Sequence, residues 1–236
     1  MMDTTQILDF FRQQVAVSKT KGVVIGLSGG IDSTLTTYLA VHALGKQNVT
    51  GLCLPHKEQS YELGYHLKEL LGIKVEVFNI APMVEATITE NPDLFDTRLQ
   101  QGNLHARARM CFLYAYAAKY KLLVAGTTNK SEFEVGYLTK FGDGAVDFEP
   151  ICHLLKTEVY VLAKKIGIPE IYITQKPTAG LWEDQTDEDE LGFSYDRLDQ
   201  VLQGKSAGIS NQILERIADL RAIAKHKQQT PPSLLS

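Results

Sequence analysis

Hydrophobic and polar positions along the chain follow two kinds of pattern. Short β-branched runs such as residues 23–25 contain no regular polar position, which is typical of strands buried on both faces of a parallel sheet. Between these runs, apolar residues recur at helical spacing, as Ile7, Phe11 and Val15 do in the opening segment. We therefore predict strands at residues 22–27, 49–54, 74–79 and 122–125, and helices at residues 4–18, 32–44, 61–71, 103–120, 155–166 and 210–225.

The alternation of strands and helices predicts an α/β fold. Parallel strands joined by right-handed helical crossovers give a doubly wound, mainly parallel sheet with helices on both faces. A length of 236 residues suits a single domain. Residues 91–102 and 127–150 show no clear periodicity, and we expect the second stretch to be a functional loop because it contains several aromatic residues. The acidic stretch at residues 186–191 is predicted to be an exposed helix start.

Composition narrows the possible partners and the compartment. The net charge of −4 gives no basic field for nucleic acid, so none is expected as a partner. No run approaches the roughly 20 apolar residues that a membrane span needs, and the first residues do not resemble a signal peptide. The three cysteines lack the paired spacing of a zinc site or a disulfide framework. We expect a cytoplasmic protein that does not bind membranes.

The segment from Ser28 to Ser33 (Ser-Gly-Gly-Ile-Asp-Ser) lies between the first predicted strand and the helix after it. Two glycines allow the backbone to turn its N–H groups toward an anion, and the helix N-terminus adds partial positive charge. Asp32 suits an anion site only if a cation is present, and Mg²⁺ binds carboxylate and phosphate oxygens together. The alternative is an ordinary turn in which Asp32 and Ser33 cap the helix.

This loop differs from the two commoner nucleotide-binding loops. It has neither the lysine of a Walker A loop nor the third glycine of a dinucleotide fingerprint. It resembles the loop of the PP-loop ATP pyrophosphatases, a superfamily with a Rossmann-like fold. The resemblance implies that ATP is cut between its α- and β-phosphates, that AMP is transferred to a substrate oxygen, and that the loop holds the pyrophosphate.

Further segments resemble one member of that superfamily, the ammonia-dependent NAD synthetases. The segments are residues 102–110, 126–132, 136–144, 147–150, 156–159 and 176–182, which occur in the family's order. The resemblance runs from about residue 22 to residue 202. It implies an ATP-dependent ligase that converts deamido-NAD to NAD with ammonia through an adenylated intermediate, in the last step of NAD biosynthesis.

The resemblance also implies roles for individual residues. ATP would be bound by Gly26, Leu27, Ser28, Gly29, Gly30, Ile31, Asp32, Ser33, Thr127, Lys156 and Thr178. Mg²⁺ would be held by Asp32 and Glu132. Deamido-NAD would be contacted by Arg107, Lys140, Asp147, His226 and Lys227. No protein nucleophile is needed, and either Asp143 or Asp147 is a candidate for the ammonia site. The family also implies a homodimer.

Elementary geometry supports part of this assignment and leaves part of it open. Asp32 and Glu132 both follow predicted parallel strands, so both belong at the carboxyl edge of the sheet, where they could share a cation. Taken alone, Glu132 could be a solvated loop acid, and Lys156 and Thr178 could be ordinary surface and turn residues. Arg107 and Arg109 are two positions apart on a helix and point in different directions, so spacing does not decide which binds substrate.

One family contact has no obvious counterpart. Members often carry an arginine near the adenosine, where this chain has His56 and Lys57. The length leaves no room for a glutaminase domain, so ammonia itself is the expected nitrogen donor. Two alternatives remain: a tRNA-modifying enzyme that uses the same loop, and a non-catalytic module that binds ATP.

Overall fold

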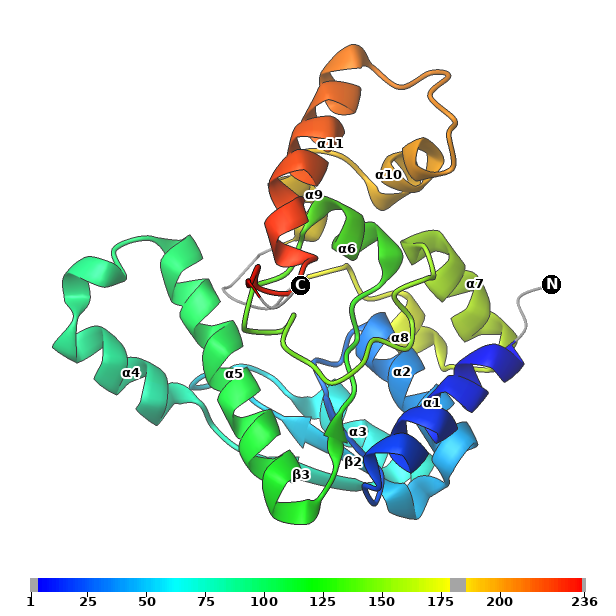
Figure 1. Cartoon of the computed structure of the whole chain (residues 1–236), viewed down its shortest axis with the longest axis vertical. Coiled ribbons are helices and arrows are strands. Elements are labelled where there is room, and N and C mark those ends of the chain that lie inside the picture. Colours follow the sequence, from blue (N-terminus) through cyan, green and yellow to red (C-terminus); the bar gives the residue numbers. More distant parts are fainter. Residues whose placement is uncertain (1–3, 179–185, 235–236) are drawn as a thin grey trace.

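Four parallel strands form the centre of the computed structural model, which describes residues 4–178 and 186–234 (Figure 1). The strands are β1 (Val23–Gly26), β2 (Val49–Cys53), β3 (Lys74–Val77) and β4 (Leu123–Val124), in the order β3-β2-β1-β4. β1 pairs on both sides, with Val23 opposite Val49 in β2 and opposite Leu123 in β4. From β1 the chain continues to β2 and β3 on one side of the sheet, and β4 then pairs with β1 on the other side. The carboxyl end of β1 therefore lies at a topological switch point.

Helices cover both faces of this sheet. One face carries α1 (Thr4–Ser18), α2 (Ile31–Leu44), α3 (Glu62–Leu71) and α7 (Lys156–Lys165), and the other carries α4 (Ala81–Glu90) and α5 (Arg98–Tyr120). Successive β1 residues point to opposite faces. Val23 and Ile25 pack in the core with α1 and α2, whereas Val24 packs with α4 and α5. The predicted doubly wound α/β class is confirmed.

A third apolar cluster stands beyond the carboxyl edge of the sheet. It joins α6 (Lys130–Val135), α9 (Asp187–Leu191), α10 (Tyr195–Leu202) and α11 (Asn211–Ala224). Val135, Leu198 and Ile217 are buried at its centre. Figure 1 shows α11 rising next to α6 and away from the strands, so this cluster forms a wall above the sheet edge. The remaining short elements are η1 (Lys46–Asn48), η2 (Pro92–Leu94), α8 (Glu170–Ile173) and η3 (Lys225–Lys227).

Two stretches predicted to be irregular contain helix. The long helix α5 begins at Arg98 because Thr97 and Gln100 form a reciprocal capping box. Asn129 and Glu132 form the same arrangement at the start of α6, inside the predicted loop 127–150. Helix α4, with Pro82 in its first turn, was also missing from the prediction. None of the helices within the described ranges is long and apolar enough to cross a bilayer.

Candidate active site

The loop after β1 leaves a helix N-terminus open. Gly29 has φ of +83°, and a Cβ there would lie 2.9 Å from the Cβ of Leu63, so a larger residue would meet both strain and a clash. The Ser28 and Ser33 hydroxyls lie 3.1 Å apart. Gly30 is the N-cap of α2 and supplies no side-chain cap. The first N–H groups of α2 are therefore available to an anion, which the helix dipole also favours.

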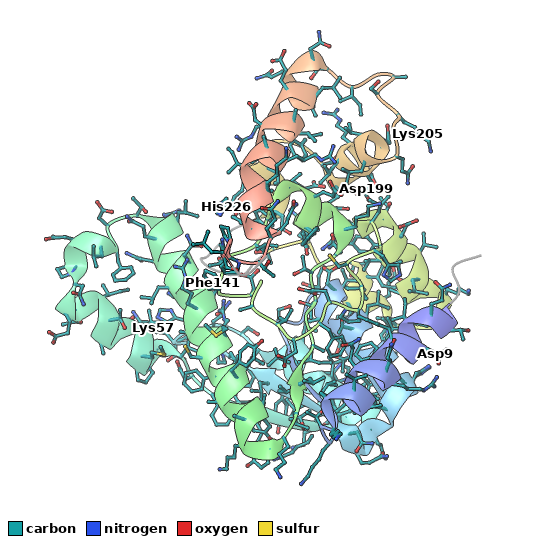
Figure 2. All side chains as sticks on the ribbon, in the orientation of Figure 1. Asp9, Lys57, Phe141, Asp199, Lys205 and His226 are labelled. Carbon is teal, nitrogen blue, oxygen red and sulfur yellow. The ribbon has the colours of Figure 1, made fainter. Side chains whose placement is uncertain are left out.

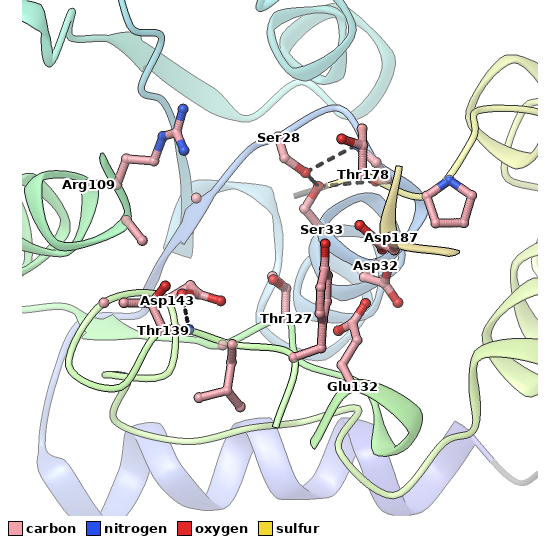
Figure 3. Close-up of a pocket in the computed structure, with 18 of the residues that line it drawn as sticks. Ser28, Asp32, Ser33, Arg109, Thr127, Glu132, Thr139, Asp143, Thr178 and Asp187 are labelled. Carbon is pink, nitrogen blue, oxygen red and sulfur yellow. Dashed lines mark hydrogen bonds between the residues drawn. The ribbon is translucent and has the colours of Figure 1, made fainter. Parts of the chain in front are cut away.

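This loop forms one wall of a cavity of about 810 Å³. The other walls come from the carboxyl end of β2, the inner side of α5, residues 126–127, residues 136–139, 142–143 and 145–146, and part of α11. Figure 3 shows Ser28, Arg109 and Thr127 at this cavity. Every residue from Gly26 to Ser33 lines it, as do Thr127 and Thr178. The volume matches the usual size of a small-molecule site. Residues 179–182, the end of the last family-like segment, lie outside the described residues.

Two carboxylates and one ammonium group meet at the floor of the cavity. Lys156 Nζ lies 2.5 Å from Asp32 Oδ2 and 3.3 Å from Glu132 Oε1, and its side chain is only 3% exposed. Asn129 Nδ2 donates to Asp32 Oδ1 at 3.0 Å. Asp32, Glu132 and Lys156 each lie in the first turn of a helix: α2, α6 and α7. Three helix N-termini therefore point their positive ends toward this cluster.

Burial and charge shift the protonation equilibria of these groups. Burial, followed by the charge of Asp32, raises the pKa of Glu132 well above its usual range, and Lys156 opposes this shift. Burial by itself would lower the pKa of Lys156, but Asp32 and Glu132 outweigh it, so the pKa of Lys156 is raised. Lys156 therefore remains an ammonium ion that offsets the two buried carboxyl groups.

The cationic residues predicted to bind substrate gather at one side of the cavity. Arg107 Nη2 donates to the carbonyl of Lys140 at 3.4 Å, and Lys140 Nζ donates to the carbonyl of His226 at 2.7 Å. Lys227 Nζ donates to the carbonyls of Gly136 and Leu138, both at 2.7 Å. Figure 2 shows His226 beside the segment that carries Phe141. Lys227 lines the cavity, whereas Arg107, Lys140 and His226 lie outside its lining.

The two arginines of α5 diverge as their spacing predicts. Arg107 is exposed, and Arg109 lines the cavity. Arg109 Nε donates to the carbonyl of Leu54 at 3.1 Å, and Nη2 donates to Gln59 Oε1 at 2.9 Å. Burial lowers the pKa of Arg109 to about 10, which leaves it charged at neutral pH. It holds the chain just past β2 against the cavity.

The two aspartates proposed for ammonia occupy different environments. Asp143 lines the cavity, its Oδ1 accepts from the N–H of Thr139 at 2.8 Å, and burial raises its pKa. Asp147 instead accepts from the N–H of Val124 at 2.7 Å and from the Tyr114 hydroxyl at 3.3 Å. Asp147 lies outside the lining and supports the backbone of β4.

Comparison with known proteins assigns the family. Residues 4–231 match the family described as NAD synthase. The chain belongs to the NAD synthase family. It is 45% identical to the NH(3)-dependent NAD(+) synthetase of Pyrococcus horikoshii over 96% of this chain and 91% of that one. It is 44% identical to the enzyme of the same name from Methanocaldococcus jannaschii, over 97% and 94% of the two chains.

Solved structures agree with this assignment. The NMN synthetase from Francisella tularensis superposes with a TM-score of 0.91 at 36% identity, covering 99% of this chain and 97% of that one. The NH3-dependent NAD synthetase from Campylobacter jejuni gives 0.83 at 32% identity, covering 99% and 100%. As a member of the NAD synthase family, the chain is a ligase that forms a C–N amide bond and uses ATP, as predicted.

The donor chemistry of this NAD synthase site suits magnesium. Asp32 and Glu132 offer hard carboxylate oxygens next to a loop built for phosphate. Asp187 adds a buried carboxylate whose Oδ1 has no hydrogen-bond partner among the described residues. In the described ranges, no three His, Cys, Asp or Glu side chains converge to hold a metal by themselves. Water molecules, or phosphate oxygens when a nucleotide is bound, would therefore complete the coordination, as is usual for Mg²⁺.

Two carboxyl groups in or next to the site were not predicted from the sequence. The acidic stretch at residues 186–191 was expected to be exposed, but Asp187 is only 3% exposed and lines the cavity. Its position after Thr186, which caps α9, was a visible signal. Glu149 Oε2 accepts from the N–H of Thr128 at 3.1 Å, directly behind the turn that carries Thr127. Nothing in the local pattern around Glu149 indicated that contact.

Proposed function

We propose that this NAD synthase family member amidates deamido-NAD to NAD with ammonia, releasing AMP and pyrophosphate. The observation that carries the proposal is the convergence of Asp32, Glu132 and Lys156 beside an uncapped helix N-terminus, all within one cavity. Such a site can hold a triphosphate and orient its α-phosphorus toward a second substrate. The names of the relatives from P. horikoshii and C. jejuni support ammonia as the nitrogen source.

In the first step, an oxygen of the nicotinate carboxylate attacks the α-phosphorus of ATP. The bond between the α-phosphorus and the bridging oxygen breaks, and pyrophosphate leaves with the electron pair. The amide N–H groups at the start of α2, the Ser28 and Ser33 hydroxyls and the Lys156 ammonium would stabilise its charge. When bound by Asp32 and Glu132, Mg²⁺ would neutralise phosphate charge. The product is an acyl-adenylate, whose leaving group is AMP.

In the second step, ammonia attacks the acyl carbon and AMP departs. Ammonium ion has no lone pair and cannot attack, so a proton must be removed before or during the step. We propose Asp143 as the proton acceptor because it faces the cavity, whereas the carboxylate of Asp147 is bonded to β4 and Tyr114. Asp143→Asn should slow amide formation more than adenylate formation. Equal slowing of both steps would remove Asp143 from this role.

The cationic residues at the side of the cavity are proposed to hold deamido-NAD. Lys227 lines the cavity and could contact the dinucleotide directly. Arg107, Lys140 and His226 pack beside it and present positive charge to phosphate oxygens of a substrate that extends out of the cavity. We also propose a homodimer in the cytoplasm. The exposed side chains of Leu99 and Phe141 offer apolar surface for a second subunit.

The test is product analysis with the purified protein, ATP, Mg²⁺, ammonium and deamido-NAD. The expected products are NAD, AMP and pyrophosphate in equal amounts, without any nucleic acid. ADP with phosphate would refute the mechanism, and nucleotide binding without turnover would favour a non-catalytic ATP-binding module. Product formation that requires a transfer RNA would favour a tRNA-modifying enzyme.

A second substrate is favoured by one comparison. The NMN synthetase from F. tularensis matches nearly the whole of both chains with a TM-score of 0.91. The same chemistry on nicotinate mononucleotide would need the same loop, metal and ammonia site but no pocket for the second nucleotide. Measuring kcat/KM for both substrates in parallel decides between them. We expect deamido-NAD to have the higher value, and a higher value for the mononucleotide would reverse the assignment.

A further inference from the structure

The ammonium group of Lys156 occupies the position between the two proposed metal ligands. Nζ is 2.5 Å from Asp32 and 3.3 Å from Glu132, distances at which no cation can enter between the two carboxylates unless Lys156 moves. All three side chains are largely buried, so displacing the ammonium without a new partner would leave a buried, unpaired charge. A site that takes a cation here must provide a second position for Lys156.

Asp187 has the properties of that second position. It is only 3% exposed and lines the same cavity, and Figure 3 shows it beside Asp32 and above Glu132. Its Oδ2 accepts from the Tyr195 hydroxyl at 2.9 Å, while Oδ1 has no hydrogen-bond partner within the described ranges. The Tyr137 hydroxyl donates to Glu190 and also interacts with the Asp187 carboxyl group.

Tyr195 connects Asp187 to the lysine. The Lys156 ammonium lies over the Tyr195 ring, 5.0 Å from its centre, and the Tyr195 hydroxyl is also 3.5 Å from Glu132 Oε1. Asp187 already interacts electrostatically with Lys156. A flexible lysine side chain can therefore pass along the ring from the Asp32–Glu132 pair to Asp187 without leaving the acidic part of the cavity.

We propose that Asp187 is a positioning residue that receives the Lys156 ammonium when a divalent cation enters between Asp32 and Glu132. This proposal rests on the proposed metal site. Three carboxyl groups face one ammonium here, and a divalent cation would supply the further positive charge that favours their ionised forms. Lys156 thus blocks cation entry between Asp32 and Glu132 in the free enzyme. Once it is held near Asp187, it can still contact the phosphates.

Manganese binding to the full-length enzyme tests this without catalysis. Mn²⁺ affinity is measured by electron paramagnetic resonance, without nucleotide, on the wild type, Lys156→Met, Asp187→Asn and the double variant. Lys156→Met removes the competing charge and should bind Mn²⁺ at least tenfold more tightly than wild type. Asp187→Asn keeps an acceptor for Tyr195 but offers Lys156 a weaker partner, so it should weaken Mn²⁺ binding about tenfold.

The double variant separates positioning from direct metal coordination. If Asp187 acts through Lys156, Asp187→Asn should have little effect on Mn²⁺ affinity once residue 156 is methionine. An equal tenfold loss in both backgrounds would make Asp187 a metal ligand and overturn the proposal. Asp196→Asn removes one exposed carboxylate on α10 and serves as the matched control, with affinity expected to stay within twofold of wild type.

The test still gives a clear result if a variant does not fold or if the proposed function is wrong. Lys156→Gln replaces Lys156→Met if the latter does not fold, with the same expected direction. An unchanged Mn²⁺ affinity in both lysine variants would overturn the proposal. Because deamido-NAD and ammonia are absent from the assay, a wrong substrate assignment would show in product analysis and would leave these affinities unaffected.

Discussion

The half-buried carboxyl group of Glu149 should make the stability of the fold depend on pH. Its Oε2 accepts from the N–H of Thr128 at 3.1 Å, and a Cβ added at Gly126 would lie 2.2 Å from the same oxygen. Burial raises the pKa of Glu149 from 4.5 to about 8, and the Thr128 contacts only partly oppose the shift. Glu149 therefore keeps its proton in the folded state at neutral pH and loses it on unfolding.

The sign of the effect follows from proton binding in the two states. Between pH 4.5 and 8, the folded protein holds a proton at Glu149 that the unfolded chain does not. Raising the pH through this window therefore lowers the free energy of unfolding, and the loss is complete above the folded pKa. At about 1.4 kcal/mol per pKa unit, the upper bound on the loss in the free energy of unfolding is about 5 kcal/mol. Because Glu149 is partly exposed, we expect about 2 kcal/mol.

Glu149→Gln removes the ionisation and keeps an oxygen that can accept from Thr128. Urea unfolding of wild type and variant at pH 5 and pH 9 gives the difference in stability, in which the other titrating groups largely cancel. From pH 5 to pH 9, the free energy of unfolding of the variant should rise by about 2 kcal/mol relative to that of the wild type. Glu58→Gln, at an exposed position, is the control and should show no such gain. If the stability difference between variant and wild type is the same at pH 5 and pH 9, the raised pKa of Glu149 is refuted.

Three further predictions concern residues in the cavity or next to it. Gly64→Ala would bring a Cβ to 2.8 Å from the Leu27 carbonyl oxygen. We therefore expect the free energy of unfolding in urea to fall by about 1–3 kcal/mol and the KM for ATP to rise. An unchanged KM would show that this contact does not shape the ATP site. Asp32→Asn should lower the rate of pyrophosphate release about 100-fold or more, and a loss of less than tenfold would argue against its role. Arg109→Met should destabilise the fold by about 2 kcal/mol because it removes the hydrogen bonds to Leu54 and Gln59. Arg107→Met should leave stability unchanged and raise the KM for deamido-NAD. Equal destabilisation by both changes would contradict these separate roles.

The sheet and its main helices could be predicted because their patterns are local. The β-branched run around Val24 and the glycine-rich turn after it specify a buried strand and a ligand loop without tertiary information. The early start of α5 and the presence of α6 were also visible, as Thr97–Gln100 and Asn129–Glu132 capping boxes. Apolar periodicity is weak at both places, so the hydrophobic pattern alone does not predict these helix starts.

The parts of the site that could not be predicted depend on contacts between distant segments. Asp32 and Lys156 are 124 positions apart, and their contact exists only because α2 and α7 begin at the same end of the sheet. The burial of Asp187 depends in the same way on Tyr195 and on the cluster around α10 and α11. Helical spacing showed that Arg107 and Arg109 diverge, but only the position of β2 decides that Arg109 faces the cavity.

Adenylation of a carboxylate at the loop after β1 can be followed by oxygen transfer. Deamido-NAD carrying ¹⁸O in its nicotinate carboxylate is incubated with the enzyme, ATP, Mg²⁺ and ammonium, and the products are analysed by mass spectrometry. One ¹⁸O atom should appear in the phosphate of AMP for each NAD formed. Label in inorganic phosphate, or AMP without label, would contradict it.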